Sequence, residues 1–378
     1  MGREEGAGGE RRVEARGGEA RTGYAGLIGG TPLVELRSLS ALTGRRILAK
    51  AEYLNPGGTG KDRIALAMIE EAERRGQLAP GGTVVEGTSG STGIALAALC
   101  ACRGYRCVIV MPDDQSPEKQ RLLRQFGAEV LVVRTASISN PQHYVNVARK
   151  LAKGEEVAGH HLPGGGYFTD QFETLANYHA HVATTGPELW QQTQGQCHAF
   201  VMSAGTGGTI AGVSRFLKSK NPGIKVVLAD PPGSSLFHFV KHGVCWAPQQ
   251  SERTVRRHRY DTIAEGIGLD RLTRNIQEAE IDDAIAVSDQ EALYMAHYLL
   301  KHEGLLVGSS SAINVVAAIR FAKEVPPGST VATVLCDSGQ RHLNRFWNPQ
   351  YATAPPYNLS WPGPNEVEEH VGRMAAVH

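Results

Sequence analysis

Short apolar runs alternate with longer amphipathic segments along most of the chain. From Arg45 onward, runs such as ILAKAEYL (47–54), GTVVEG (82–87) and YRCVIVMP (105–112) lack the polar–apolar alternation of a half-exposed strand. Apolar runs of this length between turn residues are typical of strands buried on both faces of a sheet. The same pattern predicts further strands at 128–134, 198–205, 225–231, 305–308 and 330–337.

Segments with helical periodicity separate these strands. The segment 62–75 ends at Gly76 with two arginines in its last turn, which is a helix C-terminus signal. Ser288 and Glu291 form a capping box, and Ser116 followed by Pro117 marks another helix start. Helices are therefore expected at 62–75, 91–104, 116–127, 143–154, about 174–194, 209–223, 291–304 and 312–325.

The alternation predicts the α/β fold class, with parallel sheets covered by helices on both faces. A glycine-rich bridge (LPGGGYFTD, 162–170) interrupts the pattern. We therefore expect two doubly wound α/β domains with the ligand in the cleft between them, at the carboxyl ends of the strands. The expected organisation is an N-terminal segment that crosses to the larger domain (23–60), a smaller substrate-side domain (61–165) and a larger phosphate-binding domain (166–346).

Three segments depart from this pattern. Residues 1–22 hold five arginines, five glutamates and many glycines, a composition that predicts disorder. This segment has no apolar stretch for a signal peptide, and its acids argue against a transit peptide. Residues 231–262 are expected to be irregular and polar, and the tail 347–378 is expected to wrap over the surface in an extended form.

Composition narrows the possible partners. The chain has 378 residues and a net charge of +1, so charge gives no reason to expect nucleic acid or a membrane surface as partner. No apolar run approaches the roughly 20 residues of a membrane span. Six cysteines in a chain of this length do not make a disulfide scaffold, and no paired CxxC motif predicts a metal site. The cytoplasm is the simplest compartment.

The stretch NPGGTGKDR (55–63) brings one lysine to the start of a helix. A nucleotide P-loop would need a glycine at Asn55 and a Ser or Thr at Asp62, so that interpretation fails. A solvated lysine in a turn is the plain alternative for Lys61. A helix N-terminus together with partial burial would instead disfavour its ammonium form and leave a free amine.

Three loops rich in glycine and hydroxyl groups follow predicted strands. GTSGSTG (87–93) and SAGTGGT (203–209) each open a helix, and GSSS (308–311) follows the run LLV. Backbone N–H groups at a helix N-terminus form an anion site. The first loop could hold a carboxylate, and the second suits a phosphate monoester. A lysine beside a bound phosphate monoester suggests a Schiff base between Lys61 and pyridoxal 5′-phosphate.

At this point the motifs resemble those of the cysteine synthase and cystathionine β-synthase family, the fold type II pyridoxal-phosphate enzymes. IGGTPLV (28–34) looks like the family's IGxTPL segment, and NPGGTGKDR looks like its NPxxSxKDR lysine motif. The further matches, in chain order, are TSGST (88–92), QF (171–172), GTGGT (205–209), EGIG (265–268) and GSSSA (308–312). The match covers about residues 24–345 and looks most like a fungal-type cysteine synthase subgroup.

The resemblance implies a role for each matching residue. Lys61 would bind the cofactor and move the α-proton, Ser91 would face the ring's 3′ oxygen, and Ser310 would meet the ring nitrogen. The implied phosphate ligands are Gly205, Thr206, Gly207, Gly208 and Thr209. The implied substrate-binding residues are Thr88, Ser89, Gly90, Thr92, Gln171 and Gly266. No metal is implied.

The chain departs from the family pattern in several places. Ser91 replaces the usual Asn, Gly60 replaces the Val or Ile before the lysine, and Ala312 stands where many relatives have Gly. The segment 231–262 is longer and more basic than the family's usual loop, so it could line the entrance and select a second substrate. The turn that begins at Asp337 either closes the site near the ring or merely ends the last strand.

The resemblance implies β-replacement on an O-activated L-serine through an aminoacrylate. The expected substrates are O-acetyl-L-serine and sulfide, which would give L-cysteine and acetate. Three alternatives stay open: use of L-serine with homocysteine, elimination to pyruvate and ammonia, and a weakly active paralogue that binds a partner. The resemblance also suggests a homodimer.

Overall fold

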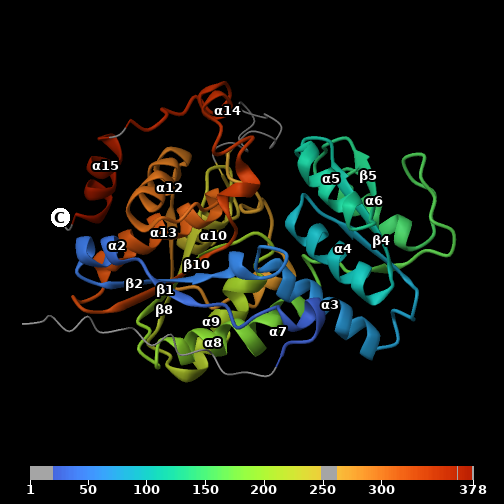
Figure 1. The fold of residues 1–378 in the computed structure, drawn as a ribbon, viewed down its shortest axis with the longest axis horizontal. Coiled ribbons are helices and arrows are strands. Elements are labelled where there is room, and N and C mark those ends of the chain that lie inside the picture. The colour runs from blue at the N-terminus through green and yellow to red at the C-terminus, as the bar shows by residue number, and fades with distance from the viewer. Residues whose placement is uncertain (1–19, 248–261, 364, 377–378) are drawn as a thin grey trace, which may run out of the picture.

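The computed structural model describes residues 20–247, 262–363 and 365–376. Two sheets, each with its own helices, form a smaller and a larger lobe on either side of a cavity (Figure 1). The predicted α/β class with parallel sheets is confirmed. The expected domain boundaries remain a prediction, and the expected disorder of 1–22 falls almost entirely outside the described residues.

The larger sheet has six strands in the order β1-β2-β10-β7-β8-β9, and only the pair β1–β2 is antiparallel. Alternate residues of β7, β8, β9 and β10 supply two separate cores. Ile47 and Val201 face a core with α2, α12 and α13, whereas Phe200 and Val226 face a core with α8, α9 and α10. The strands are β1 (Leu33–Glu35), β2 (Arg46–Ala51), β7 (Ala199–Ser203), β8 (Lys225–Asp230), β9 (Asp283–Ala286) and β10 (Thr330–Leu335). The helices are α2 (Arg37–Thr43), α8 (Gly186–Gln192), α9 (Gly208–Lys220), α10 (Leu236–His242), α12 (Asp289–Glu303) and α13 (Ser309–Phe321).

The smaller sheet has four parallel strands in the order β5-β4-β3-β6. Val84 and Ile109 pack against α3, α4 and α5 on one face, while Val85 and Val108 pack against α6 on the other. The strands are β3 (Thr83–Gly87), β4 (Arg106–Pro112), β5 (Glu129–Val133) and β6 (Tyr167–Phe168). The helices are α3 (Lys61–Arg74), α4 (Ser91–Arg103), α5 (Pro117–Gln125) and α6 (Tyr144–Ala152).

The helix signals in the sequence place most helix ends correctly. The capping box of Ser288 and Glu291 is present, and Gly76 takes a φ of +67° just past α3. Ser116 occupies the N-cap of α5, although its side chain caps no backbone N–H. The long helix expected at 174–194 consists of α7 (Leu175–Ala180), a π-helical turn (His181–Thr185) and α8, and it ends at Gln192.

Three expectations about secondary structure are wrong. The run LLVG is no strand, because only Val307 forms an isolated bridge, to Ser338. The segment 231–262 is not irregular throughout, since it contains α10; its residues 248–261 lie outside the described part. The tail contains helices, because apolar residues at helical spacing, such as Val367 and Val371, pack α15 against α12. The other short helices are α1 (Gly23–Gly26), α11 (Arg274–Gln277), α14 (Pro349–Thr353) and α15 (Glu366–Ala375).

None of the helices in the described ranges combines the length and apolarity that crossing a bilayer requires. Within the same ranges, no group of three His, Cys, Asp or Glu side chains is arranged to hold a metal ion.

Candidate active site

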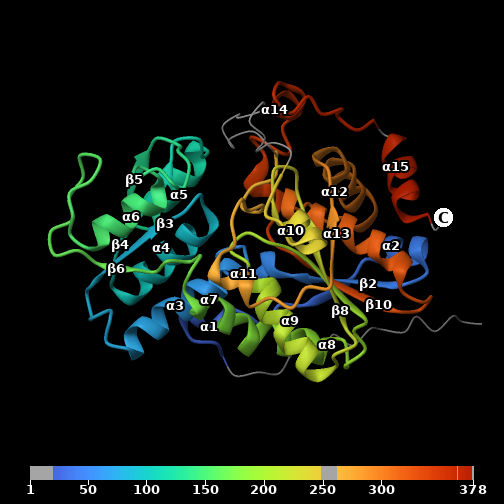
Figure 2. The same ribbon diagram turned by 180° about the vertical axis from the view of Figure 1, so that it is seen from behind.

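A cavity of about 720 Å³ lies between the two lobes, and both lobes contribute to its walls. The two ribbon views show the lobes meeting through α3 and α7 (Figure 2). Residues that follow the carboxyl ends of strands line the cavity, among them Thr88 after β3, Gly205 after β7 and Asp337 after β10. This is the position at which open α/β sheets bind their ligands.

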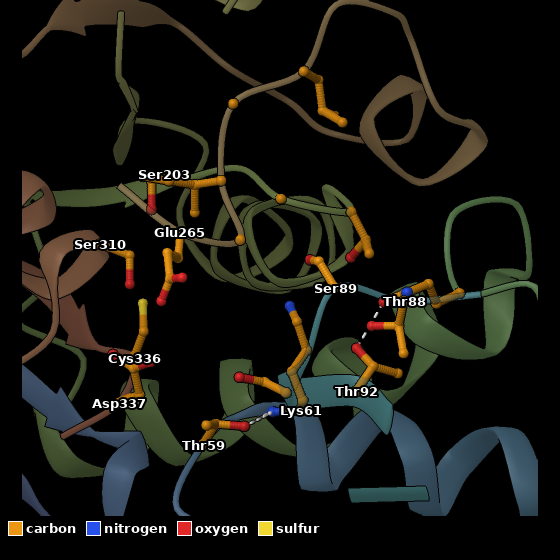
Figure 3. A pocket seen from close by; sticks show the side chains of 18 of the residues that line it. Thr59, Lys61, Thr88, Ser89, Thr92, Ser203, Glu265, Ser310, Cys336 and Asp337 are labelled. Carbon is orange, nitrogen blue, oxygen red and sulfur yellow. Dashed lines mark hydrogen bonds between the residues drawn. The ribbon is translucent and has the colours of Figure 1, made fainter. Parts of the chain in front are cut away.

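Lys61 is the first residue of α3, and its backbone N–H donates to Thr59 Oγ1 at 3.0 Å. Its side chain projects into the cavity, with Thr88 and Ser89 on one side and Ser310 on the other (Figure 3). Burial lowers the pKa of the Lys61 amine, while the nearby Cys336 and Asp337 partly oppose that shift. The lysine therefore offers an amine that loses its proton more readily than an exposed lysine does.

The turn before Lys61 is held by Asp62, the acid that ruled out a P-loop. Its carboxylate accepts the Gly57 N–H at 3.0 Å and the Tyr24 hydroxyl at 2.8 Å. Arg341 donates to the Gly57 carbonyl from the other lobe. A Cβ on Gly57 would lie 2.2 Å from Asp62 Oδ1, so glycine is required for this close approach. Asp62 is thus a structural residue of the lysine turn.

The loop 205–209 forms a tightly packed cradle at the start of α9. Gly207 has a φ of +90°, and a Cβ there would lie 2.7 Å from the backbone nitrogen of Ile276. Thr206 Oγ1 accepts a hydrogen bond from Asn177 Nδ2 at 2.8 Å, and Thr209 Oγ1 lies 3.1 Å from His181 Nε2. Because the loop opens a helix of 13 residues, its free N–H groups favour an anion.

A second polar wall comes from the loop 88–92 and Gln171. Thr92 Oγ1 donates to Gln171 Oε1 at 2.6 Å, and the Gln171 amide donates to the Gly87 carbonyl at 3.2 Å. Glu86 lies behind Gln171: its carboxyl accepts the Gln171 N–H at 3.2 Å and the Thr169 hydroxyl. Burial raises the pKa of Glu86 to about 8. The residues of this wall that line the cavity are therefore polar and uncharged.

Ser310 lies in the first turn of α13, where it is 6% exposed and lines the cavity. Cys336 lies beside it, and burial raises the pKa of the Cys336 thiol to about 12. Ser310 and Cys336 therefore both meet the cavity as uncharged groups.

Most of the predicted site residues meet in this one cavity. Those that line it are Lys61, Thr88, Ser89, Ser91, Thr92, Gln171, Gly205, Thr206, Gly207, Thr209, Gly266 and Ser310. Gly90 and Gly208 do not line it. A Cβ on Gly208 would lie 1.9 Å from Asn177 Oδ1, so this glycine allows the loop to pack closely. The roles assigned to these residues remain predictions.

Sequence reasoning missed a charged cluster that lines the cavity. Glu265 lies within ion-pair distance of Lys119, Arg345 and His342, and His342 also pairs with Asp337. Burial alone would lower the pKa of His342, but Asp337 and Glu265 raise it to about 9. The only sequence signal was the ending CDSGQRHLN, since the other members are far apart in the chain.

A family model described as pyridoxal-phosphate dependent enzyme matches residues 24–337, and the chain belongs to this family. It is 52% identical to cysteine synthase 2 of Schizosaccharomyces pombe over 333 residues, 87% of this chain and 84% of that protein. A Saccharomyces cerevisiae relative, provisionally named as a mitochondrial cysteine synthase, is 50% identical over 86% of this chain and 84% of its own length. The family resemblance, the cofactor and the cysteine-synthase type of enzyme predicted from the motifs are confirmed.

The fold has a counterpart among solved structures. The crystal structure of O-ureido-L-serine synthase is 30% identical to this chain and superimposes with a TM-score of 0.73, covering 85% of this chain and 93% of that one. This similarity places the chain among the fold type II enzymes.

The residues of the cavity fit pyridoxal 5′-phosphate. Lys61 supplies a buried amine with a lowered pKa, and the loop 205–209 supplies a helix N-terminus for the phosphate. Ser203 Oγ is buried without a protein partner at the base of this loop, and Ser310 supplies a hydroxyl at the opposite wall. The donor set therefore matches an aldehyde, a phosphate and a neutral ring nitrogen.

Proposed function

We propose that the protein converts O-acetyl-L-serine and sulfide into L-cysteine and acetate. The observation that carries this proposal is the position of Lys61, a desolvated amine between a phosphate cradle and a loop suited to a carboxylate. The Cβ–O bond of the substrate breaks and its electron pair leaves with acetate. The hydrosulfide ion (HS⁻) then forms the Cβ–S bond, and the α-proton removed at the start returns to Cα.

Pyridoxal 5′-phosphate supplies the electron sink for this chemistry when it is bound. In our proposal the Lys61 amine takes the α-proton and gives it back. Thr88, Ser89, Thr92 and Gln171 hold the substrate carboxylate, because their hydroxyl, amide and backbone donors line one wall. This orients the α-proton toward the lysine.

The leaving group is supported by the protonation chemistry of the site. Acetate departs without a proton, whereas hydroxide from L-serine needs an acid. His342, a candidate acid, has both ring nitrogens within ion-pair distance of carboxylates: Nε2 lies 2.8 Å from Asp337 and Nδ1 lies 2.9 Å from Glu265. This arrangement favours an activated serine over serine itself.

The substrate is tested by steady-state assays of O-acetyl-L-serine, O-phospho-L-serine and L-serine, each with sulfide or homocysteine. We expect the highest kcat/KM with O-acetyl-L-serine and sulfide. Turnover of L-serine alone would overturn the proposal, and preference for O-phospho-L-serine would change the leaving group. A spectrum that does not change on adding O-acetyl-L-serine would instead favour the weakly active paralogue.

The attachment site is tested without turnover. Borohydride reduction of the yellow holoenzyme should fix the cofactor to the peptide that contains Lys61, as read by mass spectrometry. Lys61→Ala should lose both the visible band and the labelled peptide. Lys153→Ala, which removes an exposed lysine, should keep both. Label on any other lysine would contradict the assignment.

The remaining expectations belong to the same proposal. We place the phosphate at 205–209, the ring nitrogen at Ser310 and the 3′ oxygen near Ser91, where a shorter donor replaces the family's usual Asn. We also expect a homodimer, tested by sedimentation, and a cytoplasmic location, tested by cell fractionation because one relative's name refers to mitochondria. The contribution of 231–262 to second-substrate choice can be tested by shortening that loop.

A further inference from the structure

The two lobes are joined by an ion pair that lines the cavity. Lys119 lies on α5 of the smaller lobe and Glu265 lies in the larger lobe, with Lys119 Nζ 3.1 Å from Glu265 Oε1. Both side chains line the cavity and are largely buried, at 14% and 12% exposure. Charges in such a position are screened by salt much less than exposed ones.

Three cationic side chains, those of Lys119, Arg345 and His342, contact the Glu265 carboxylate. Arg345 Nη1 lies 2.9 Å from Oε1, and His342 Nδ1 lies 2.9 Å from Oε2. Burial alone would raise the pKa of Glu265, but His342, Lys119 and Arg345 hold it well below the usual range. Arg345 also donates to the Asp114 carbonyl, which makes a second bridge to the smaller lobe. The Glu265 carboxylate and its partner Arg345 therefore hold α5 and the loop before it against the larger lobe.

The same charged cluster extends to the part of the cavity that Ser310 and Asp337 line. The Glu265 N–H donates to Ser309 Oγ at 3.3 Å, next to Ser310. His342 Nε2 lies 2.8 Å from Asp337 Oδ2, and Asp337 lines the cavity. A Cβ on Gly308 would lie 2.0 Å from Asp337 Oδ1, so glycine lets this carboxylate pack against the start of α13. The position of α5 is thus mechanically linked to the wall that would face the cofactor ring.

We propose that Lys119 and Glu265 form a clasp that holds the two lobes together over the bound amino acid and slows its escape before sulfide adds. This inference rests on the proposed β-replacement. In this proposal the pair separates when substrate enters the cavity and reforms afterwards. Closure excludes water and keeps the reacting groups aligned. Lys119 and Glu265 are positioning residues, since neither is required to touch the reacting atoms.

The clasp should control how much of the dehydrated amino acid becomes L-cysteine and how much becomes pyruvate. After acetate has left, the dehydrated amino acid either gains sulfide and becomes L-cysteine or escapes and takes up water to give pyruvate and ammonia. A weakened clasp favours escape. The ratio of pyruvate to L-cysteine therefore reports clasp strength separately from the overall rate.

The experiment compares variants of the holoenzyme at fixed O-acetyl-L-serine and sulfide. Lys119→Gln should raise the pyruvate-to-cysteine ratio about tenfold. Lys119→Arg, which keeps the cation, should restore a ratio near that of the wild type. The matched control is Arg121→Gln, because Arg121 is on the same helix but pairs with Glu118 at the surface, where its side chain is 71% exposed. An unchanged ratio in Lys119→Gln would overturn the clasp.

A second measurement does not depend on turnover. Hydrogen exchange in α5 of the holoenzyme should be faster in Lys119→Gln than in Arg121→Gln. Equal exchange in the two single variants would contradict the clasp. If the wild type forms no L-cysteine from any activated serine, the proposed function fails, and the exchange experiment alone decides whether the clasp exists.

Discussion

Arg63, two residues beyond Lys61, forms a buried bidentate ion pair with Glu52. Arg63 Nε and Nη2 each lie 2.8 Å from a different oxygen of Glu52, and the two side chains are 1% and 2% exposed. The guanidinium also pairs with Glu188 on α8, which in turn receives the fully buried amine of Lys50. The first turn of α3 is therefore fixed to the larger lobe by a network with balanced charge.

Removing the guanidinium should be costly. Arg63→Gln leaves Glu52 buried without its main counter-ion, and breaking such a pair typically costs about 3–5 kcal/mol. Urea unfolding should show this loss as a lower midpoint. The control is Arg215→Gln, whose ion pair with Glu280 is exposed and should be worth no more than about 1 kcal/mol. Equal midpoints for the two variants would contradict a stabilising role for the network.

The proposed phosphate loop should tolerate no side chain at Gly207. Gly207→Ala combines a positive φ with a Cβ 2.7 Å from the Ile276 backbone, so the loop must move and cofactor affinity should fall at least about tenfold. Gly104→Ala tests the same backbone conformation without a clash, because its φ is +74° and nothing lies within 4 Å. Fluorescence titration of the apoenzyme with the cofactor measures both. Similar affinities in the two variants would show that the close packing of 207 is unimportant.

Glu86 should make stability depend on pH. Its folded-state pKa of about 8 lies above the ordinary value of 4.5, so the uncharged carboxyl is favoured in the fold. Its contribution is greatest below the ordinary pKa and declines as pH rises toward about 8. Glu86→Gln should therefore gain thermal stability relative to the wild type between about pH 6 and 9. A constant difference in Tm across that range would mean that Glu86 is charged throughout.

His342 should stabilise the fold through its positive charge. Its pKa of about 9 exceeds the ordinary 6.5, so this stabilisation is complete below about pH 6.5 and is lost as pH rises through about 9. His342→Gln should lower Tm most below about pH 6.5, and the difference from the wild type should shrink as pH rises toward about 10. His161→Gln, which changes an exposed histidine, is the surface control. If the loss of Tm in His342→Gln did not depend on pH, it would come from packing rather than from charge.

Much of the site could be predicted because its parts are local in sequence. The lysine turn and the glycine loops each join a strand end to a helix start, and the physics of helix N-termini applies to them without knowledge of the fold. Parallel sheets then bring those strand ends to one edge. This is why Lys61, Thr88 and Thr206 were expected to share a cleft and are found in the same cavity.

The charged clusters could not be predicted, because their members are far apart in the chain. Glu265 meets Lys119 across 146 positions (265 − 119), and Arg63 meets Glu188 across 125. A single sequence gives each of these residues only as a charge that is usually exposed. The helix α15 was missed for a different reason, since the Pro- and Tyr-rich stretch before it masked the helical spacing of Val367 and Val371.

The strand pairing has a consequence for how the protein is synthesised. Strands β2 and β10 are hydrogen-bonded neighbours with Arg46 opposite Thr330, so β2 waits for a partner that is synthesised 284 residues later (330 − 46). The smaller sheet needs only residues 83–168 and can form while the ribosome is still working. Until β10 has been synthesised, the edge of β2 that pairs with it is exposed. Chaperones protect such unpaired strand edges from aggregation. A truncated chain lacking β10 should therefore retain a folded smaller lobe and lose the larger one.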